Sequence, residues 1–164
     1  SKGSFFHHFP TKDALARALV DRYADADVGH LHAALAVTAG VAEPGARLLA
    51  FVRLFEDGAD ELMAEQSSCL YVATLTERQL ATGAAGEPIE RAVAAWRSEV
   101  AGLLERALEA RGRAGAVDAD AWADHLFVTF EGAFLLCRST GDAGHMRRQL
   151  RVMREALEAL LGDG

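Results

Sequence analysis

The chain has 164 residues, of which 51% are hydrophobic, and its formal net charge is −7. This length fits one domain, or one and a fraction, with a sizeable buried core. The 3 prolines and the lack of an alternating β-branched run favour an all-α fold. The net charge argues against nucleic-acid binding by the chain as a whole, and no apolar run is long enough to cross a bilayer.

Basic charge gathers at the N-terminal end. Residues 1–22 hold four basic and two acidic side chains, a net +2, whereas residues 23–164 hold 13 basic and 22 acidic side chains, a net −9. Attraction to phosphate is therefore expected at the N-terminal end. Cys69 and Cys137 lie in apolar stretches and are expected to be buried thiols. With no signal peptide in the sequence, these features predict a cytoplasmic protein.

Helix signals divide the chain after its first dozen residues. Thr11 is a candidate N-cap for a helix that ends near Gly40. The expected apolar stripe of this helix is Leu15, Leu19, Tyr23 and Ala26. Pro44 is well placed in the first turn of the next helix, and Ser67-Ser68 is expected to separate two helical pieces between residues 60 and 82.

Three longer helices are expected in the second half, at about 88–111, 119–139 and 143–162, the middle one capped by Asp118. Heptad-like spacing on the last two predicts an antiparallel hairpin in a four-helix arrangement, with one face free for a second copy of the chain. The predicted dimer interface consists of Phe127, Phe134, Cys137, Met146, Leu150, Met153 and Leu157. The alternative is that both faces of the hairpin belong to the core of a single chain.

The first twelve residues, SKGSFFHHFPTK, place small and polar side chains before aromatic and imidazole ones and end in a Pro-Thr-Lys turn. This string resembles the recognition helix and following turn of TetR-family (tetracycline-repressor-like) transcription regulators, with Phe6 where the pattern has Tyr. A helix-turn-helix needs another helix before the recognition helix, so the N-terminal helices are expected to be missing. The resemblance implies an all-α fold with a partial helix-turn-helix head, residues 1–27, and a helical effector-binding and dimerisation body, residues 28–164.

The resemblance also implies a set of DNA contacts. Lys2 and Ser4 would face bases in the major groove, and Lys12 would clamp a phosphate. The implied DNA-binding residues are Lys2, Gly3, Ser4, Phe6, His7, His8 and Lys12. The plain alternative is that these are solvated side chains on an exposed turn.

A small apolar effector that binds among the central helices is implied as well. Aromatic side chains and Met with a few polar groups suit such a site, although a helical core uses the same residues. The candidate effector-binding residues are Phe51, Phe55, Met63, Cys69, Tyr71, Thr74, Trp96, Trp122, His125 and Phe130.

Catalytic and metal sites are not expected. His30 and His32 are two residues apart and point in different directions on a helix, so they cannot share a metal ion. No nucleophile elbow, phosphate loop or HExxH motif is present. The chain is therefore predicted to be no enzyme and to need no cofactor. The leading hypothesis is a homodimeric, ligand-responsive repressor that binds a palindromic double-stranded operator. The alternative is a helical small-molecule- or protein-binding module that no longer binds DNA.

Overall fold

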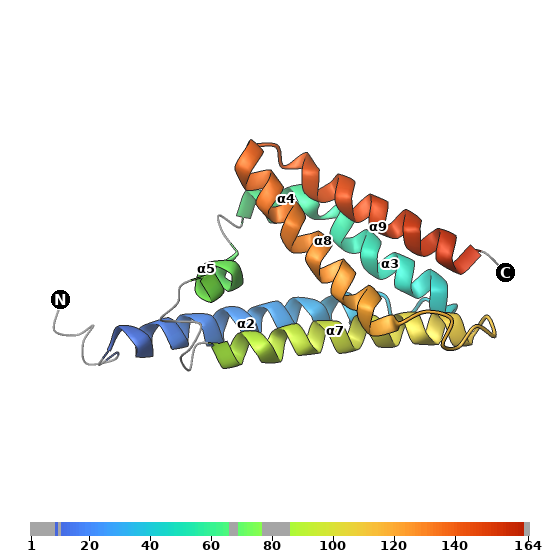
Figure 1. Cartoon of the computed structure of the whole chain (residues 1–164), viewed down its shortest axis with the longest axis horizontal. Helices are drawn as coiled ribbons and strands as arrows, with labels where there is room; N and C mark the ends of the chain where they lie inside the picture. The colour runs from blue at the N-terminus through green and yellow to red at the C-terminus, as the bar shows by residue number, and fades with distance from the viewer. Residues whose placement is uncertain (1–8, 10, 66–68, 77–85, 163–164) are drawn as a thin grey trace. The chain divides into compact units, whose positions relative to one another are not determined.

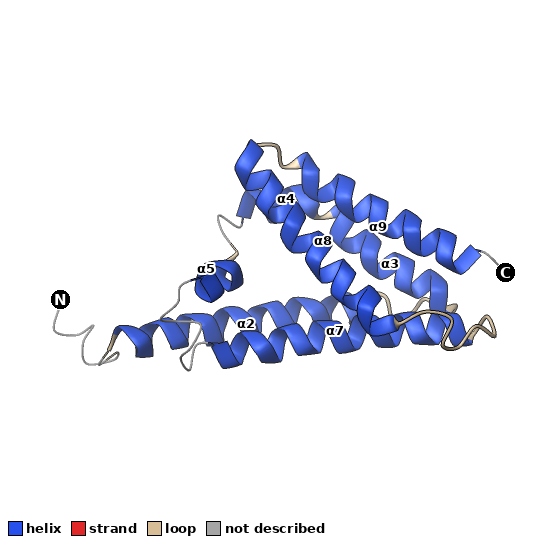
Figure 2. Cartoon of the chain, in the orientation of Figure 1, coloured by secondary structure: helices blue, strands red, loops and turns tan. Residues whose placement is uncertain are grey.

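The computed structural model describes residues 9, 11–65, 69–76 and 86–162. Within these ranges the secondary structure is helical and contains no strand (Figure 2), which confirms the all-α fold. The helices are α2 (Lys12–Val37), α3 (Pro44–Asp57), α4 (Ala59–Glu65), α5 (Leu70–Thr76), α7 (Gly86–Glu109), α8 (Ala119–Thr140) and α9 (Gly144–Gly162), as labelled in Figure 1.

Side-chain caps set the beginnings of three helices. Thr11, Glu43 and Asp118 precede α2, α3 and α8, and each accepts a hydrogen bond from the backbone amide three residues further on. Such a bond satisfies an amide that has no partner inside the helix. Pro44 follows Glu43 as the first residue of α3, where its missing amide costs nothing. The predicted caps Thr11 and Asp118 are thus confirmed.

The chain divides into two compact units. Unit 1 comprises residues 1–30 and 68–95, and unit 2 comprises residues 31–67 and 96–164. Helices α2 and α7 each contribute their first part to unit 1 and their second part to unit 2.

Unit 1 packs α5 and the first parts of α2 and α7 around a small core. Its buried residues are Val20, Ala24, Tyr71, Ile89 and Ala92. Two ion pairs join α2 to α7 at the surface: Arg17 to Glu87 at 3.2 Å and Arg91 to Asp21 at 3.3 Å. Since both pairs join residues 70 positions apart, the two helices run parallel in this unit.

The buried face of α2 differs from the predicted stripe. Leu19 was expected in the core, yet its side chain is 54% exposed, whereas the neighbouring Val20 is 2% exposed. Ala26 is also exposed, and Ala24 is buried instead. Val20 and Ala24 are four residues apart on one side of α2 and pack in one core with Tyr71 and Ile89. Which side of the helix faces these partners is a tertiary constraint that hydrophobicity along one helix does not reveal.

Unit 2 is organised around α9, which packs against α3, α4 and α8 (Figure 1). Helix α9 runs antiparallel to α8 after a short turn, and it runs back along α3 and α4. Gly141 ends α8 in the left-handed conformation, with φ 74°, and its amide donates to the Cys137 carbonyl at 2.9 Å. The heptad positions of α9 are buried as their spacing predicts: Met146, Leu150, Met153 and Leu157.

Candidate functional site

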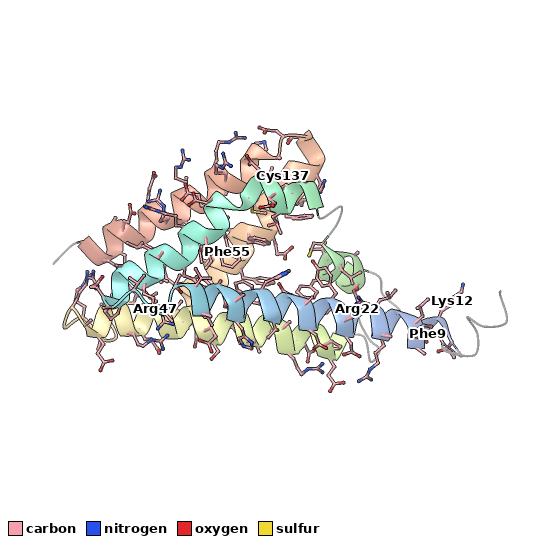
Figure 3. The ribbon with its side chains drawn as sticks, turned by 180° about the vertical axis from the view of Figure 1, so that it is seen from behind. Phe9, Lys12, Arg22, Arg47, Phe55 and Cys137 are labelled. Atoms are coloured by element: carbon pink, nitrogen blue, oxygen red, sulfur yellow. The ribbon has the colours of Figure 1, made fainter. Side chains whose placement is uncertain are left out.

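The N-terminal end of α2 is the described part nearest to the expected DNA-binding segment. Figure 3 shows Lys12 at this end, and its side chain is exposed. The Thr11 hydroxyl caps the helix by accepting from the Ala14 amide at 3.0 Å. Helix N-termini carry partial positive charge and free amides, which favour a phosphate. The other implied DNA contacts, namely Lys2, Gly3, Ser4, Phe6, His7 and His8, lie outside the described residues.

In unit 1, a polar pair lies at the edge of the apolar core. The Tyr71 hydroxyl on α5 donates a hydrogen bond of 2.8 Å to Asp27 Oδ2 on α2. The ring of Tyr71 is 5% exposed and packs edge-on against Tyr23, with 5.1 Å between ring centroids. A single side chain of α5 therefore makes both a polar and an aromatic contact with α2.

Burial and the nearby carboxylate keep Tyr71 protonated. Burial raises the pKa of its phenol far above the usual value of 10.0, and the negative charge of Asp27 together with its hydrogen bond raises the pKa further. The phenol is thus a hydrogen-bond donor over the whole physiological pH range. Cys69 packs partly buried against the same core, and Thr74 is 2% exposed. These three are the predicted effector residues that belong to unit 1.

In unit 2, three aromatic side chains form a continuous cluster. Phe51 and Phe55 are 5.3 Å apart between centroids, and Trp96 lies 6.2 Å from Phe51 and 5.4 Å from Phe55. Phe51 is fully buried, whereas Phe55 (Figure 3) and Trp96 are half-buried. These two half-buried rings are the members of the cluster that are partly exposed to solvent.

The remaining predicted effector residues are dispersed over unit 2. Trp122 and His125, both on α8, lie 6.3 Å apart between ring centroids. Met63 is buried on α4, and Phe130 is half-buried on α8. The ten candidates therefore divide into a set of three in unit 1 and a set of seven in unit 2.

Two carboxylates at the helix contacts were missed from the sequence. Asp27 is the acceptor for Tyr71. Glu56 on α3 is 5% exposed and accepts from Arg151 at 2.9 Å and Arg154 at 2.7 Å, both on α9. Burial raises the pKa of Glu56, but the hydrogen bonds and positive charges of Arg154 and Arg151 outweigh it and hold the pKa below its usual 4.5. The position of Glu56 one turn after the buried Val52 was an available signal.

Residues 44–153 match a family model described as the C-terminal domain of tetracycline-repressor-like proteins. The chain belongs to the tetracycline-repressor-like (TetR) family. No curated protein and no solved structure matches it. Membership indicates a regulator with a ligand-binding role rather than an enzyme. The match begins at α3, so it covers neither residues 1–12 nor α2.

The predicted dimer interface of this TetR-family chain needs a correction, because most of its residues are already buried within one chain. Their side chains are at most 5% exposed, except that of Phe127, which is half-buried. The buried members are Phe134, Cys137, Met146, Leu150, Met153 and Leu157. The heptad spacing correctly marks the side of each helix that packs against other helices. Those helices belong to the same chain, since α9 packs against α8, α3 and α4.

Exposed apolar side chains also occur on both helices of the hairpin in this TetR-family chain, and those of α8 lie on one side of that helix. On α8, Val128 is 63% exposed, Leu135 64% and Leu136 44%; on α9, Val152 is 58% exposed. Exposed apolar side chains that cluster on one face are typical of protein–protein contacts.

The described residues contain neither a cluster of metal ligands nor a helix that could span a membrane. No group of three or more His, Cys, Asp or Glu side chains in the described ranges has an arrangement that could hold a metal ion. None of the described helices is long and apolar enough to span a membrane.

Proposed function

We propose that this chain is the sensing and dimerising part of a homodimeric transcriptional regulator, a repressor that a small molecule releases from its operator. The observation that carries the proposal is the family match over residues 44–153. It is supported by the motif SKGSFFHHFPTK, whose last residue, Lys12, is the first residue of α2. On this basis residues 1–27 belong to the DNA-binding head, residues 28–164 form the effector-binding and dimerisation domain, and the protein works in the cytoplasm.

The DNA contacts proposed for the head follow from the chemistry of the motif. Lys2 and Ser4 offer donors to base edges in the major groove. Lys12 adds a full positive charge to a helix N-terminus capped by Thr11. Because the rest of the chain is strongly acidic, contact with the phosphate backbone concentrates at this end.

Two places suit the effector. In unit 1, the pair of Tyr71 and Asp27 provides directional hydrogen bonding beside an apolar core. In unit 2, the half-buried rings of Phe55 and Trp96 provide an apolar surface. Both favour a largely apolar effector with few polar groups. The unit 1 pair involves α2, the helix that runs from the proposed head into the body.

Salt-titrated binding to the DNA upstream of the gene tests the proposal. The full gene product is expected to bind tightly and to lose affinity steeply as salt rises. Lys12→Gln should weaken binding and reduce the slope of log affinity against log salt by about one. The matched control is Arg22→Gln, which removes the same charge from an exposed position of α2 ten residues further along.

Each result of this titration has a definite meaning. An equal effect of both substitutions would show a general charge effect and would contradict the assigned phosphate contact. No salt-dependent binding by the full gene product would instead favour a helical binding module without DNA-binding activity.

A further inference from the structure

Arg47, near the beginning of α3, has a half-buried guanidinium whose hydrogen-bonding groups are largely unused. Its Nε is buried without a hydrogen-bond partner, and its Nη2 donates to the Leu35 carbonyl at 3.4 Å, a distance at which such a bond is weak. No carboxylate in the described part of the chain forms an ion pair with it. Because a guanidinium has five N–H donors, most of its capacity is free for another acceptor.

Elsewhere in unit 2 a buried guanidinium has its partner within the chain. The side chain of Arg154 is 12% exposed and pairs with Glu56 at 2.7 Å. Glu43, four residues before Arg47, is occupied, because it pairs with Arg111 at 2.7 Å and caps α3. Leaving the enclosed N–H of a charged side chain unpaired is costly. Arg47 therefore has the character of a binding group for an anion.

Aromatic rings lie on the same side of α3 as Arg47. Phe51 and Phe55 follow it by four and eight residues, a spacing that places side chains along one side of a helix. Figure 3 labels Arg47 and Phe55 at the two ends of this stretch, and their α-carbons are about 12 Å apart by helical rise. The half-buried ring of Trp96 on α7 lies 5.4 Å from that of Phe55. A cationic donor and an aromatic surface are thus within the length of one small molecule.

We propose that Arg47 binds the carboxylate of the effector, whose apolar body lies against Phe55 and Trp96. This inference rests on the proposed function and names the ligand class, an apolar carboxylic acid that is ionised at physiological pH. A carboxylate suits the site because its two oxygens match neighbouring N–H groups of a guanidinium.

The competing role of Arg47 is purely structural. Leu35 lies in the last turn of α2, where carbonyls lack a partner inside the helix, so the bond from Arg47 would serve only to stabilise that end. A structural role predicts a change in stability alone, whereas the proposed role predicts a preference for anionic ligands. The experiment therefore compares acids with their uncharged amides.

Isothermal titration calorimetry of the full gene product measures this preference. The probes are phenylacetate, phenylbutyrate and phenylhexanoate, each beside its primary amide, which keeps the shape and removes the charge. At least one acid should bind about tenfold more tightly than its amide, as expected for a charge-assisted contact with a half-buried guanidinium. This ratio is measured on the unsubstituted protein, so it does not depend on the folding of any variant.

Arg47→Gln should abolish the preference by weakening the acid about tenfold and leaving the amide unchanged. The matched control is Arg113→Gln. Arg113 is also half-buried in unit 2 and donates to a backbone carbonyl, that of Leu160, at 2.6 Å. Its substitution removes the same charge and should leave the ratio of acid to amide affinity as it was.

Each contrary result overturns a defined part of the proposal. Equal binding of acids and amides would overturn the anionic class and leave an apolar effector standing. A less stable Arg47→Gln with an unchanged affinity ratio would assign Arg47 the structural role. Binding of no acid at millimolar concentration would overturn the ligand class, and the operator titration, which needs no effector, distinguishes that result from failure of the proposed regulator.

Discussion

Tyr71 on α5 and Asp27 on α2 are 44 positions apart in the sequence, and a hydrogen bond of 2.8 Å joins them. The bond joins the short helix α5 to the long helix α2, which follows the motif that we propose binds DNA. Because α5 has 7 residues, it is too short to be stable alone, and its position depends on such tertiary contacts. Substitutions at this pair are therefore informative about both stability and regulation.

Tyr71→Phe removes the hydroxyl and keeps the ring. We expect a loss of about 1–2 kcal/mol in the free energy of unfolding, the usual cost of deleting one partner of a buried hydrogen bond. Urea unfolding followed by circular dichroism measures it. Asp27→Asn is the milder comparison because it preserves an oxygen acceptor. An unchanged midpoint for Tyr71→Phe would show that the bond does not contribute to stability.

Alkaline pH should lower the free energy of unfolding of the wild type more than that of Tyr71→Phe. The folded protein raises the pKa of Tyr71 above the ordinary 10.0, so the phenol ionises first in the unfolded chain. Its stabilising contribution is complete below pH 10 and is lost as pH rises beyond that value. Unfolding free energies of the two proteins should converge above pH 10, and parallel curves would contradict the raised pKa.

Glu56→Gln removes a buried charge that holds two arginines of α9. We expect a loss of about 2–3 kcal/mol, since Arg154 remains largely buried without its full partner. The control is Glu158→Gln: Glu158 also accepts from Arg154 but is 40% exposed, so the loss should be below about 1 kcal/mol. Equal losses would show that burial of Glu56 has no special effect.

The difference in unfolding free energy between the wild type and Glu56→Gln should also depend on pH. Because the folded protein lowers the pKa of Glu56 below 4.5, its stabilisation is complete above pH 4.5 and is lost as pH falls through the lower folded value. The gap between wild type and Glu56→Gln should therefore narrow in acid. A gap that stays constant down to pH 3 would contradict the lowered pKa.

Two glycine substitutions should change the free energy of unfolding in opposite directions. Gly141 has φ 74° at the end of α8, so Gly141→Ala is expected to cost about 1 kcal/mol. Gly29 lies exposed within α2 with no atom to obstruct a Cβ, so Gly29→Ala should gain up to about 1 kcal/mol. Thermal unfolding of the two variants measures both effects, and a gain from Gly141→Ala would refute the left-handed cap.

Local features of the fold could be predicted from the sequence because they depend on nearby residues. Asp118 caps a helix through a bond to an amide only three residues away. The spacing of Met146, Leu150 and Met153 likewise defines one helix face. The choice between Leu19 and Val20 as the core residue of α2 depends instead on the shape of α5 and α7, which no single helix encodes. Tertiary packing likewise decided that Phe134 and Cys137 lie inside the chain.

The candidate site was predictable only where it depends on residue type and not on distant contacts. Residue type correctly identified Tyr71 and Thr74 as polar groups among apolar ones, and both are buried in the structure. The acceptor Asp27 escaped notice because its partner is far away in the sequence. The division of the effector candidates between two units is also a tertiary property.

The arginines of α9 are neutralised by acidic residues of their own chain. Arg147 pairs with Asp60, Arg148 with Asp142, and Arg151 and Arg154 with Glu56. A helix that appears strongly cationic by composition therefore presents a nearly balanced electrostatic potential to solution. Non-specific electrostatic attraction of polyanions to α9 is therefore expected to be weak.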